Sequence, residues 1–198
     1  MVSRGVGTAA SAKGSLVKLD APNAEPAMTS ATILVVGAPG VGKTAFLRSA
    51  SRISPPSTVV RLGATADGLS GVAFEFSRIQ LSGDLVVNLL SAASGPALWA
   101  TWDHFARGAI GVVLLADACR LDTVSASIDF LARRHMPYLV AVTRLDQDLR
   151  VEDVRGALAL SSSAPVVRCD ARDRQSAEWT LAALVEHGGP HVSCRRGS

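Results

Sequence analysis

Short runs of consecutive apolar residues alternate along the chain with segments whose apolar residues recur every three or four positions. The first pattern is typical of strands that are buried on both faces of a parallel sheet, and the second is typical of helices that pack on such a sheet. Together they predict strands over residues 32–37, 110–116, 137–143 and 165–168, and helices over residues 43–51, 122–134, 151–160 and 176–186.

Two further segments favour an antiparallel hairpin. Residues 72–81 alternate in part between apolar and polar positions, and residues 84–90 follow after Ser82-Gly83. Strands that alternate with helices indicate a doubly wound α/β sheet with helices on both faces. We therefore predict a three-layer α/β fold with a six-stranded, mostly parallel sheet, in which the hairpin contributes one antiparallel edge strand.

The two ends of the chain lack this periodicity. Residues 1–30 are rich in Ala, Gly, Ser and Pro, and residues 188–198 begin with Gly-Gly-Pro. Such segments are typical of flexible tails, which leaves residues 31–187 as one domain. No apolar run approaches the ~20 residues that span a bilayer, and residues 1–30 lack the apolar stretch of a signal peptide. We expect a cytoplasmic protein, for which any recruitment to a membrane would come through a partner.

Charge and cysteine content exclude other classes of function. The formal net charge of +3 lies entirely in the two predicted tails, and the domain has as many acidic as basic residues. A nucleic-acid-binding domain would show a basic face, so this balance counts against one. The three cysteines are widely spaced, which fits neither a zinc site nor a disulfide framework.

The sharpest motif covers residues 37–44, Gly-Ala-Pro-Gly-Val-Gly-Lys-Thr, between a predicted strand and a predicted helix. It has the spacing of a phosphate-binding loop, in which backbone N–H groups and the helix N-terminus face phosphate oxygens. Lys43 is the only lysine of the domain and would face the β- and γ-phosphates, while the Thr44 hydroxyl would bind Mg²⁺. The predicted phosphate-binding residues are Gly37, Ala38, Gly40, Val41, Gly42, Lys43, Thr44 and Ala45.

Asp146 follows the predicted strand 137–143, at the sheet edge where open α/β sheets bind ligands. A carboxylate there can accept hydrogen bonds from N1 and N2 of guanine, and adenine has no matching donors. The motifs therefore predict GTP or GDP, with Mg²⁺, as the ligands.

Residues 99–117 (Trp-Ala-Thr-Trp-Asp-His-Phe-Ala-Arg-Gly-Ala-Ile-Gly-Val-Val-Leu-Leu-Ala-Asp), with Arg120-Leu121, resemble the D-type small GTPases of actinobacterial conservons. The chain is also similar, more distantly, to the gliding-motility GTPase of myxobacteria, and the resemblance extends from about Ile33 to His187. It implies a Ras-like P-loop fold and a signalling switch that works with a Roadblock-type protein and a sensor-kinase-like system.

The same resemblance assigns the base-binding residues. Cys169-Asp-Ala-Arg-Asp173 resembles the last nucleotide-binding loop of that family. By this likeness Asp146 reads guanine, Thr143 stands where the family has Asn, and the Ala171 N–H meets the guanine oxygen. The implied guanine-binding residues are Thr143, Arg144, Asp146, Ala171 and Arg172.

Several positions depart from the family pattern. Ser94 replaces a glycine that meets the γ-phosphate, and Gly95 stands at the position of the water-orienting glutamine. Thr143 lacks the amide that ties its loop to the phosphate loop. Ser70 and Thr65 are the candidates for a second Mg²⁺ hydroxyl. Because the binding elements are better preserved than the hydrolytic ones, we expect slow or partner-dependent GTP hydrolysis and name no catalytic residue.

Two alternatives stay open. The first is a pseudo-GTPase scaffold that works by binding a partner. The second is a P-loop ATPase or small-molecule kinase, which would need an acidic residue at the end of the strand beside the phosphate loop, where Ser91 and its neighbours offer none. Asp117, at the end of the strand 110–116, could orient a switch segment or cap the helix that follows, and capping is the expectation.

Overall fold

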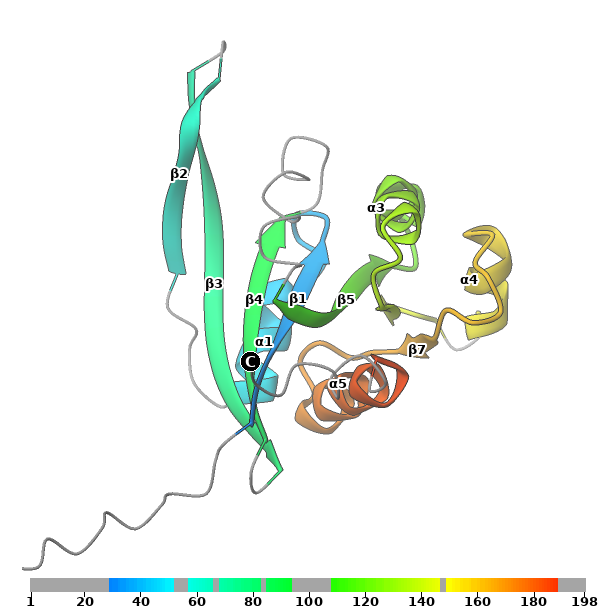
Figure 1. Cartoon of the computed structure of the whole chain (residues 1–198). Helices are drawn as coiled ribbons and strands as arrows, with labels where there is room; N and C mark the ends of the chain where they lie inside the picture. The colour runs from blue at the N-terminus through cyan, green and yellow to red at the C-terminus, as the bar shows by residue number, and fades with distance from the viewer. Residues whose placement is uncertain are drawn as a thin grey trace, which may run out of the picture.

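The computed structural model describes residues 29–51, 57–65, 68–82, 85–93, 108–146 and 149–188 (Figure 1). Its strands and helices agree with those predicted from the sequence to within a few residues, apart from one additional strand. In chain order the elements are β1 (Thr29–Gly37), α1 (Lys43–Ser51), β2 (Ser57–Thr65), β3 (Gly68–Ser82), β4 (Leu85–Ala93), β5 (Ala109–Asp117), α3 (Asp122–Arg133), β6 (Tyr138–Thr143), α4 (Val151–Ala157), β7 (Val166–Arg168) and α5 (Arg174–Gly188).

One sheet joins all the described strands in the order β2-β3-β4-β1-β5-β6-β7. Strands β4, β1, β5, β6 and β7 are parallel to their neighbours in this series, whereas β3 is antiparallel to both β4 and β2. The predicted α/β class is confirmed. The sheet has seven strands rather than six, and β2, not the hairpin strand β3, forms the edge.

The extra strand exists because β3 is 15 residues long. Its second half pairs with β4 from Glu75 onward, and its first half pairs with β2. Residues 57–65 show no regular alternation of apolar and polar positions, so the pattern alone gave no strand there. Figure 1 shows that the resulting β2–β3 hairpin extends past the carboxyl end of β4. The chain leaves β1 at this same end of the sheet.

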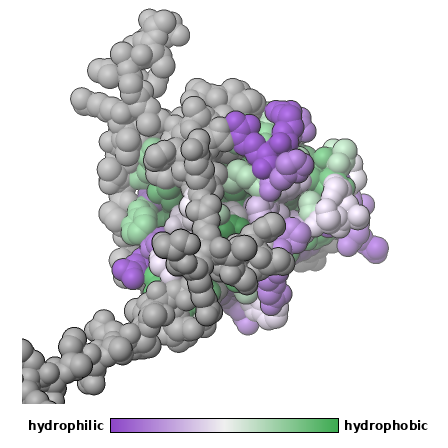
Figure 2. Space-filling view, in the orientation of Figure 1, coloured by the Kyte–Doolittle hydropathy of each residue, from purple (hydrophilic) through white to green (hydrophobic). Residues whose placement is uncertain are grey.

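The core has two layers, one on each face of the sheet. In β1, Ile33 and Val35 point to one face, while Leu34 and Val36 point to the other. The first face packs against α1 and α5, and the second against α3 and α4. The exposed residues of α3 include Asp122, Ser125 and Asp129, as expected for a helix that buries only one side. Figure 2 shows hydrophilic residues in this part of the molecule.

Several sequence predictions concern residues that the structure does not describe. The segment with Ser94 and Gly95 lies outside the described residues, as does most of the predicted tails. Strand β1 begins at Thr29 and α5 ends at Gly188, slightly inside those tails. Within the described part of the chain, no helix has both the length and the apolar character needed to cross a membrane.

Candidate nucleotide-binding site

The loop between β1 and α1 has a conformation that its glycines make possible. Gly40 and Gly42 have φ angles of +79° and +110°, which L-residues with a side chain rarely adopt. At Gly37 a Cβ atom would lie 2.8 Å from the backbone oxygen of Leu115. The spacing Gly-x-x-Gly-x-Gly is therefore a steric requirement of this loop, which turns sharply before α1 begins at Lys43.

Lys43 folds over the loop that precedes it. Its Nζ donates hydrogen bonds to the carbonyl oxygens of Gly37 (2.9 Å) and Ala38 (3.0 Å). Burial lowers the pKa of Lys43, and the nearby Glu75 carboxylate opposes that shift. The ammonium thus lies among phosphate-loop groups, where an oxyanion would compete with the two carbonyl oxygens for it.

Thr44 contacts a residue that the sequence analysis missed. Its hydroxyl donates to the carboxylate of Glu75, with Oγ1 lying 2.7 Å from Oε1 and 2.8 Å from Oε2. Glu75 is a lone acidic residue between two phenylalanines in β3. Only its place in an alternating strand could have hinted at a special role, and the sequence did not reveal which residue it would face.

The predicted Mg²⁺ candidates Ser70 and Thr65 are not brought to Thr44. Ser70 lies five positions before Glu75 in β3, which is roughly 16 Å along an extended strand. Thr65 pairs with Gly68 at the far end of the β2–β3 hairpin. Both side chains lie outside the described part of the structure.

A cavity of about 610 Å³ adjoins the phosphate loop, a size within the range of ligand pockets. Three segments that are far apart in the sequence line it: the phosphate loop, the loop after β6 and the loop after β7. Of the predicted site residues it is lined by Gly40, Val41, Gly42, Ala45, Thr143, Arg144, Ala171 and Arg172. Other lining residues, which the sequence analysis did not propose, include Leu145, Arg168, Asp170 and Ser176.

Asp146 lies beside this cavity and does not line it. It is exposed, and its backbone oxygen accepts a hydrogen bond from Nη2 of Arg168 at 3.3 Å. The preceding residues of the same loop, Thr143 to Leu145, do line the cavity. The proposed reader of guanine is thus at the rim of the cavity.

Hydrogen bonds shape the loop after β7 and connect it to α1, beside the phosphate loop. Asp170 accepts from the N–H of Arg172 (2.9 Å), and Asp173 caps α5 by accepting from the N–H of Ser176 (2.7 Å). Ser49 of α1 donates to the Ala171 carbonyl oxygen at 3.0 Å. A Cβ on Gly42 would lie 3.2 Å from the Ala171 Cβ, so the two loops are in close contact.

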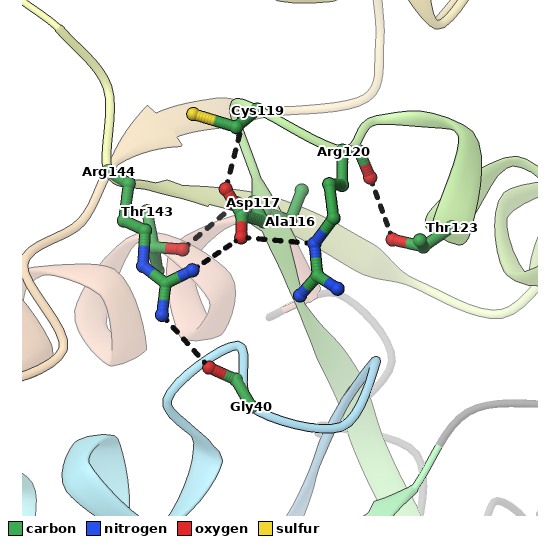
Figure 3. Close-up of polar contacts among 8 residues, drawn as sticks. All are labelled: Gly40, Ala116, Asp117, Cys119, Arg120, Thr123, Thr143 and Arg144. Atoms are coloured by element: carbon green, nitrogen blue, oxygen red, sulfur yellow. Dashed lines mark hydrogen bonds and ion pairs between the residues drawn. The ribbon is translucent and has the colours of Figure 1, made fainter.

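Figure 3 shows how Arg144 joins the loop after β6 to the phosphate loop. Its Nη2 donates to the Gly40 carbonyl oxygen (3.2 Å), and its Nη1 donates to Oδ2 of Asp117 (2.7 Å). Asp117 is only 1% exposed, and its Oδ2 also lies 3.5 Å from Nε of Arg120. Arg144 therefore makes the connection between these two loops for which Thr143 has no amide group.

The structure also corrects the predicted role of Asp117. Its Oδ1 accepts from the N–H of Cys119 at 3.0 Å, so it caps the turn after β5 and not the helix. Helix α3 begins at Asp122, and its N-cap residue, Leu121, makes no side-chain capping bond. The Thr143 hydroxyl donates to the Ala116 carbonyl oxygen at 3.2 Å, which joins β6 to β5.

Solved structures that are similar to this chain include domains of a GTPase. The G domain of the T. maritima FeoB iron transporter superposes with a TM-score of 0.58 at 17% sequence identity, covering 80% of this chain and 99% of that one. The cytosolic domain of the same transporter, in apo form and in GDP form I, gives TM-scores of 0.59 and 0.58 at 16% identity, covering 86% of this chain and 66% of theirs. The chain has the fold of a P-loop GTPase G domain.

No protein-family model matches the sequence, and no curated protein matches it. At these low identities the likeness establishes the fold alone. Within this G-domain fold, the phosphate loop is continuous in sequence. Arg144, in the loop after β6, and Glu75 of β3 contact its residues Gly40 and Thr44. Strand β2 and the long β3 form the hairpin that extends past the end of β4.

Proposed function

We propose that this protein binds GTP and GDP at the phosphate loop and acts as a signalling switch with a Roadblock-type partner. One observation supports nucleotide binding above all others. A glycine-dependent loop that carries Lys43 and Thr44 adjoins a cavity of about 610 Å³, lined by the two loops that we assign to the base. Guanine is favoured because Asp146 lies at the rim of that cavity and because the similar FeoB domain occurs in a GDP form.

Mg²⁺ is the metal that fits this site. It prefers hard oxygen ligands and usually takes one or two from the protein, with the rest from phosphates and water. Thr44 offers a hydroxyl that already lies beside a carboxylate, which is a set of oxygen donors of that kind. When bound, Mg²⁺ would neutralise part of the negative charge of the β- and γ-phosphates.

Hydrolysis is proposed to be slow or to depend on the partner. Unassisted small GTPases cleave GTP at only about 10⁻⁴ s⁻¹, and their rate depends on a residue that orients the attacking water. In β4, Ser91 is a buried neutral residue where P-loop NTPases use an acidic one. Gly95 offers no side chain to orient water. Single-turnover cleavage near 1 s⁻¹ by the isolated protein would contradict this part of the proposal.

The decisive experiment is equilibrium binding of fluorescent GDP, GTP, ADP and ATP to the purified chain with Mg²⁺. We expect guanine nucleotides to bind tightly and adenine nucleotides at least ~100-fold more weakly, because a carboxylate at the base site would be left unpaired by adenine. Lys43→Ala should reduce GDP affinity by about two orders of magnitude or more, because it removes a charged hydrogen-bond donor to phosphate. Equal affinity for both bases would favour the ATPase or kinase alternative.

The partner is proposed on the resemblance of residues 99–121, and the test uses a Roadblock-fold protein of a conservon. Size-exclusion chromatography with that protein should show a complex whose stability differs between the GDP-loaded and GTP-analogue-loaded states. A complex that is equally stable in both states would contradict a switch, and the absence of a complex in either state would contradict the partner assignment. Membrane recruitment, if it occurs, would then follow from the partner.

One observation favours the scaffold alternative. Lys43 and Thr44 both have protein partners, namely the loop carbonyl oxygens and Glu75, which nucleotide and metal would have to share or displace. A chain that bound neither GDP nor GTP but still formed the complex would be a pseudo-GTPase.

A further inference from the structure

The carboxylate that Thr44 contacts lies on β3 and not on the strand next to β1. In P-loop NTPases an acidic residue at the end of the strand next to the loop's own strand helps to hold Mg²⁺. Here that neighbouring strand is β4, which ends in Ser91, Ala92 and Ala93. Ser91 is buried and neutral, so β4 itself supplies no charge to a cation.

Glu75 lies one strand further out at the same level of the sheet. The β3–β4 register pairs Glu75 with Ser91, and the β1–β4 register pairs Ser91 with Val35, two residues before the phosphate loop. Because side chains alternate along a strand, Glu75 shares a face with Ser77 and Ile79, and Ile79 packs in the core beneath α1. That face is the one covered by α1, and Thr44 lies in the first turn of this helix.

We propose that Glu75 provides the carboxylate of the Mg²⁺ site, in place of the acidic residue that β4 lacks. The inference rests on the proposed nucleotide binding. Both carboxylate oxygens lie within 2.8 Å of the Thr44 hydroxyl, which is itself the predicted Mg²⁺ ligand. A cation bound by Thr44 would therefore lie next to Glu75, either in direct contact or through one water molecule.

The charges at the site favour a cation there. Glu75 acts on the charge of Lys43, but the Lys43 ammonium donates its hydrogen bonds to two loop carbonyl oxygens and not to the carboxylate. A carboxylate beside the β- and γ-phosphates would repel them through a partly buried region where screening is weak. With Mg²⁺ between them the same carboxylate becomes attractive. Nucleotide binding should therefore depend more steeply on Mg²⁺ when Glu75 is present than when it is neutral.

Among the described residues no group of three or more His, Cys, Asp or Glu side chains could hold a metal by itself. The site is therefore one that phosphate oxygens must complete, which is how Mg²⁺ is usually bound beside a nucleotide. The protein would contribute Thr44 and Glu75, and the nucleotide would contribute the rest.

Glu75→Gln tests this assignment, because it removes the charge and keeps the shape and the acceptor for Thr44. The measurement is the release rate of fluorescent GDP with saturating Mg²⁺ and after chelation. In the wild type, chelation should speed release at least ~10-fold, which is the scale of changes in outer metal partners. In Glu75→Gln, release with Mg²⁺ should already be fast, and chelation should change it less than about two-fold. Electron paramagnetic resonance with Mn²⁺ and GDP should show weaker metal binding.

Glu178→Gln is the matched control, since Glu178 lies on α5 and pairs with Arg174 at the surface. It should behave as the wild type. Glu75→Asp, which keeps the charge on a shorter side chain, should retain part of the Mg²⁺ dependence, and it tests the proposal if Glu75→Gln fails to fold. Adding Ser91→Asp to Glu75→Gln should restore Mg²⁺ dependence from the neighbouring strand.

Two results would overturn the assignment. If Glu75→Gln keeps the wild-type Mg²⁺ dependence, Glu75 is not on the metal side. If Glu75→Gln binds GDP more tightly both with and without Mg²⁺, Glu75 only repels phosphate. A wild-type chain that binds no guanine nucleotide with Mg²⁺ would instead overturn the proposed function, and the metal assignment with it.

Discussion

The phosphate side and the base side of the site are built differently. The phosphate loop is a continuous segment, residues 37–44. Its conformation depends on glycine at positions 37, 40 and 42. The base side joins loops that are far apart along the chain. It is held by single hydrogen bonds such as Ser49 to Ala171 and Arg144 to Gly40, which connect residues 122 and 104 positions apart.

This difference leads us to expect that the two sides tolerate substitution unequally. A glycine of the phosphate loop either lies against backbone or has a φ angle that other residues rarely adopt, so no other residue easily replaces it. A tie between loops can be remade by another side chain that reaches the same carbonyl oxygen. Thr143 lacks an amide, and Arg144 joins its loop to Gly40 and to the buried Asp117 instead.

The largest expected effect is on the phosphate side. Gly37→Ala would place a Cβ 2.8 Å from both the Leu115 backbone oxygen and a Val41 side-chain carbon. We expect a loss of about 1–3 kcal/mol in the free energy of unfolding, because the backbone of β5 cannot move away easily. Denaturant titration measures it. Gly156→Ala is the control: a Cβ there meets nothing within 4 Å in helix α4, and about 0.5–1 kcal/mol of stabilisation is expected. Equal effects would contradict the steric account.

A smaller effect is expected on the base side. Arg144→Ala removes the tie to Gly40 and one partner of Asp117, which is nearly fully buried. Because the Arg144 side chain is 57% exposed, we expect only about 1 kcal/mol of destabilisation, together with several-fold weaker GDP binding. Arg174→Ala, which breaks a surface pair with Glu178, should cost less than about 0.5 kcal/mol and leave GDP binding unchanged.

Thr143→Asn sharpens the same test. In the Arg144→Ala background an asparagine amide should recover part of the lost GDP affinity, because it offers an amide N–H donor that the threonine side chain lacks. If Arg144→Ala alone leaves GDP affinity and stability unchanged, Arg144 is an ordinary surface arginine and the base loop is held by other contacts.

The smallest expected effect is on the alkylation rate of a cysteine. Burial raises the pKa of Cys169, a thiol in the lining of the base-side cavity. The thiolate is the reactive form, so at a given pH Cys169 should be alkylated more slowly than an ordinary thiol, and its rate should keep rising at a pH where ordinary thiols have levelled off. Mass spectrometry of maleimide-treated protein measures the rate at each cysteine. Bound GDP should slow Cys169 further and leave the exposed Cys119 unaffected.

Much of the fold could be predicted because its elements are local. Strand β5 is an unbroken apolar run, α3 has apolar residues on one side only, and the phosphate-loop motif lies between β1 and α1. Strand β2 could not be predicted, since its residues become a strand by pairing with the long β3 and not by their own pattern. The same limit applied to Asp117, whose main partner, Arg144, lies 27 residues away.

The sequence by itself determined the α/β order and the glycine-dependent loop before α1, because these depend on local periodicity and on glycine conformations. Only the tertiary structure decided which charges meet that loop. Glu75 faces Thr44 across 31 residues because β3 pairs with β4 in one particular register, and a shift of one residue would turn its side chain to the other face. Arg144 reaches Gly40 because β1 and β6 lie on either side of β5 in one sheet, and their carboxyl ends are at the same end of that sheet.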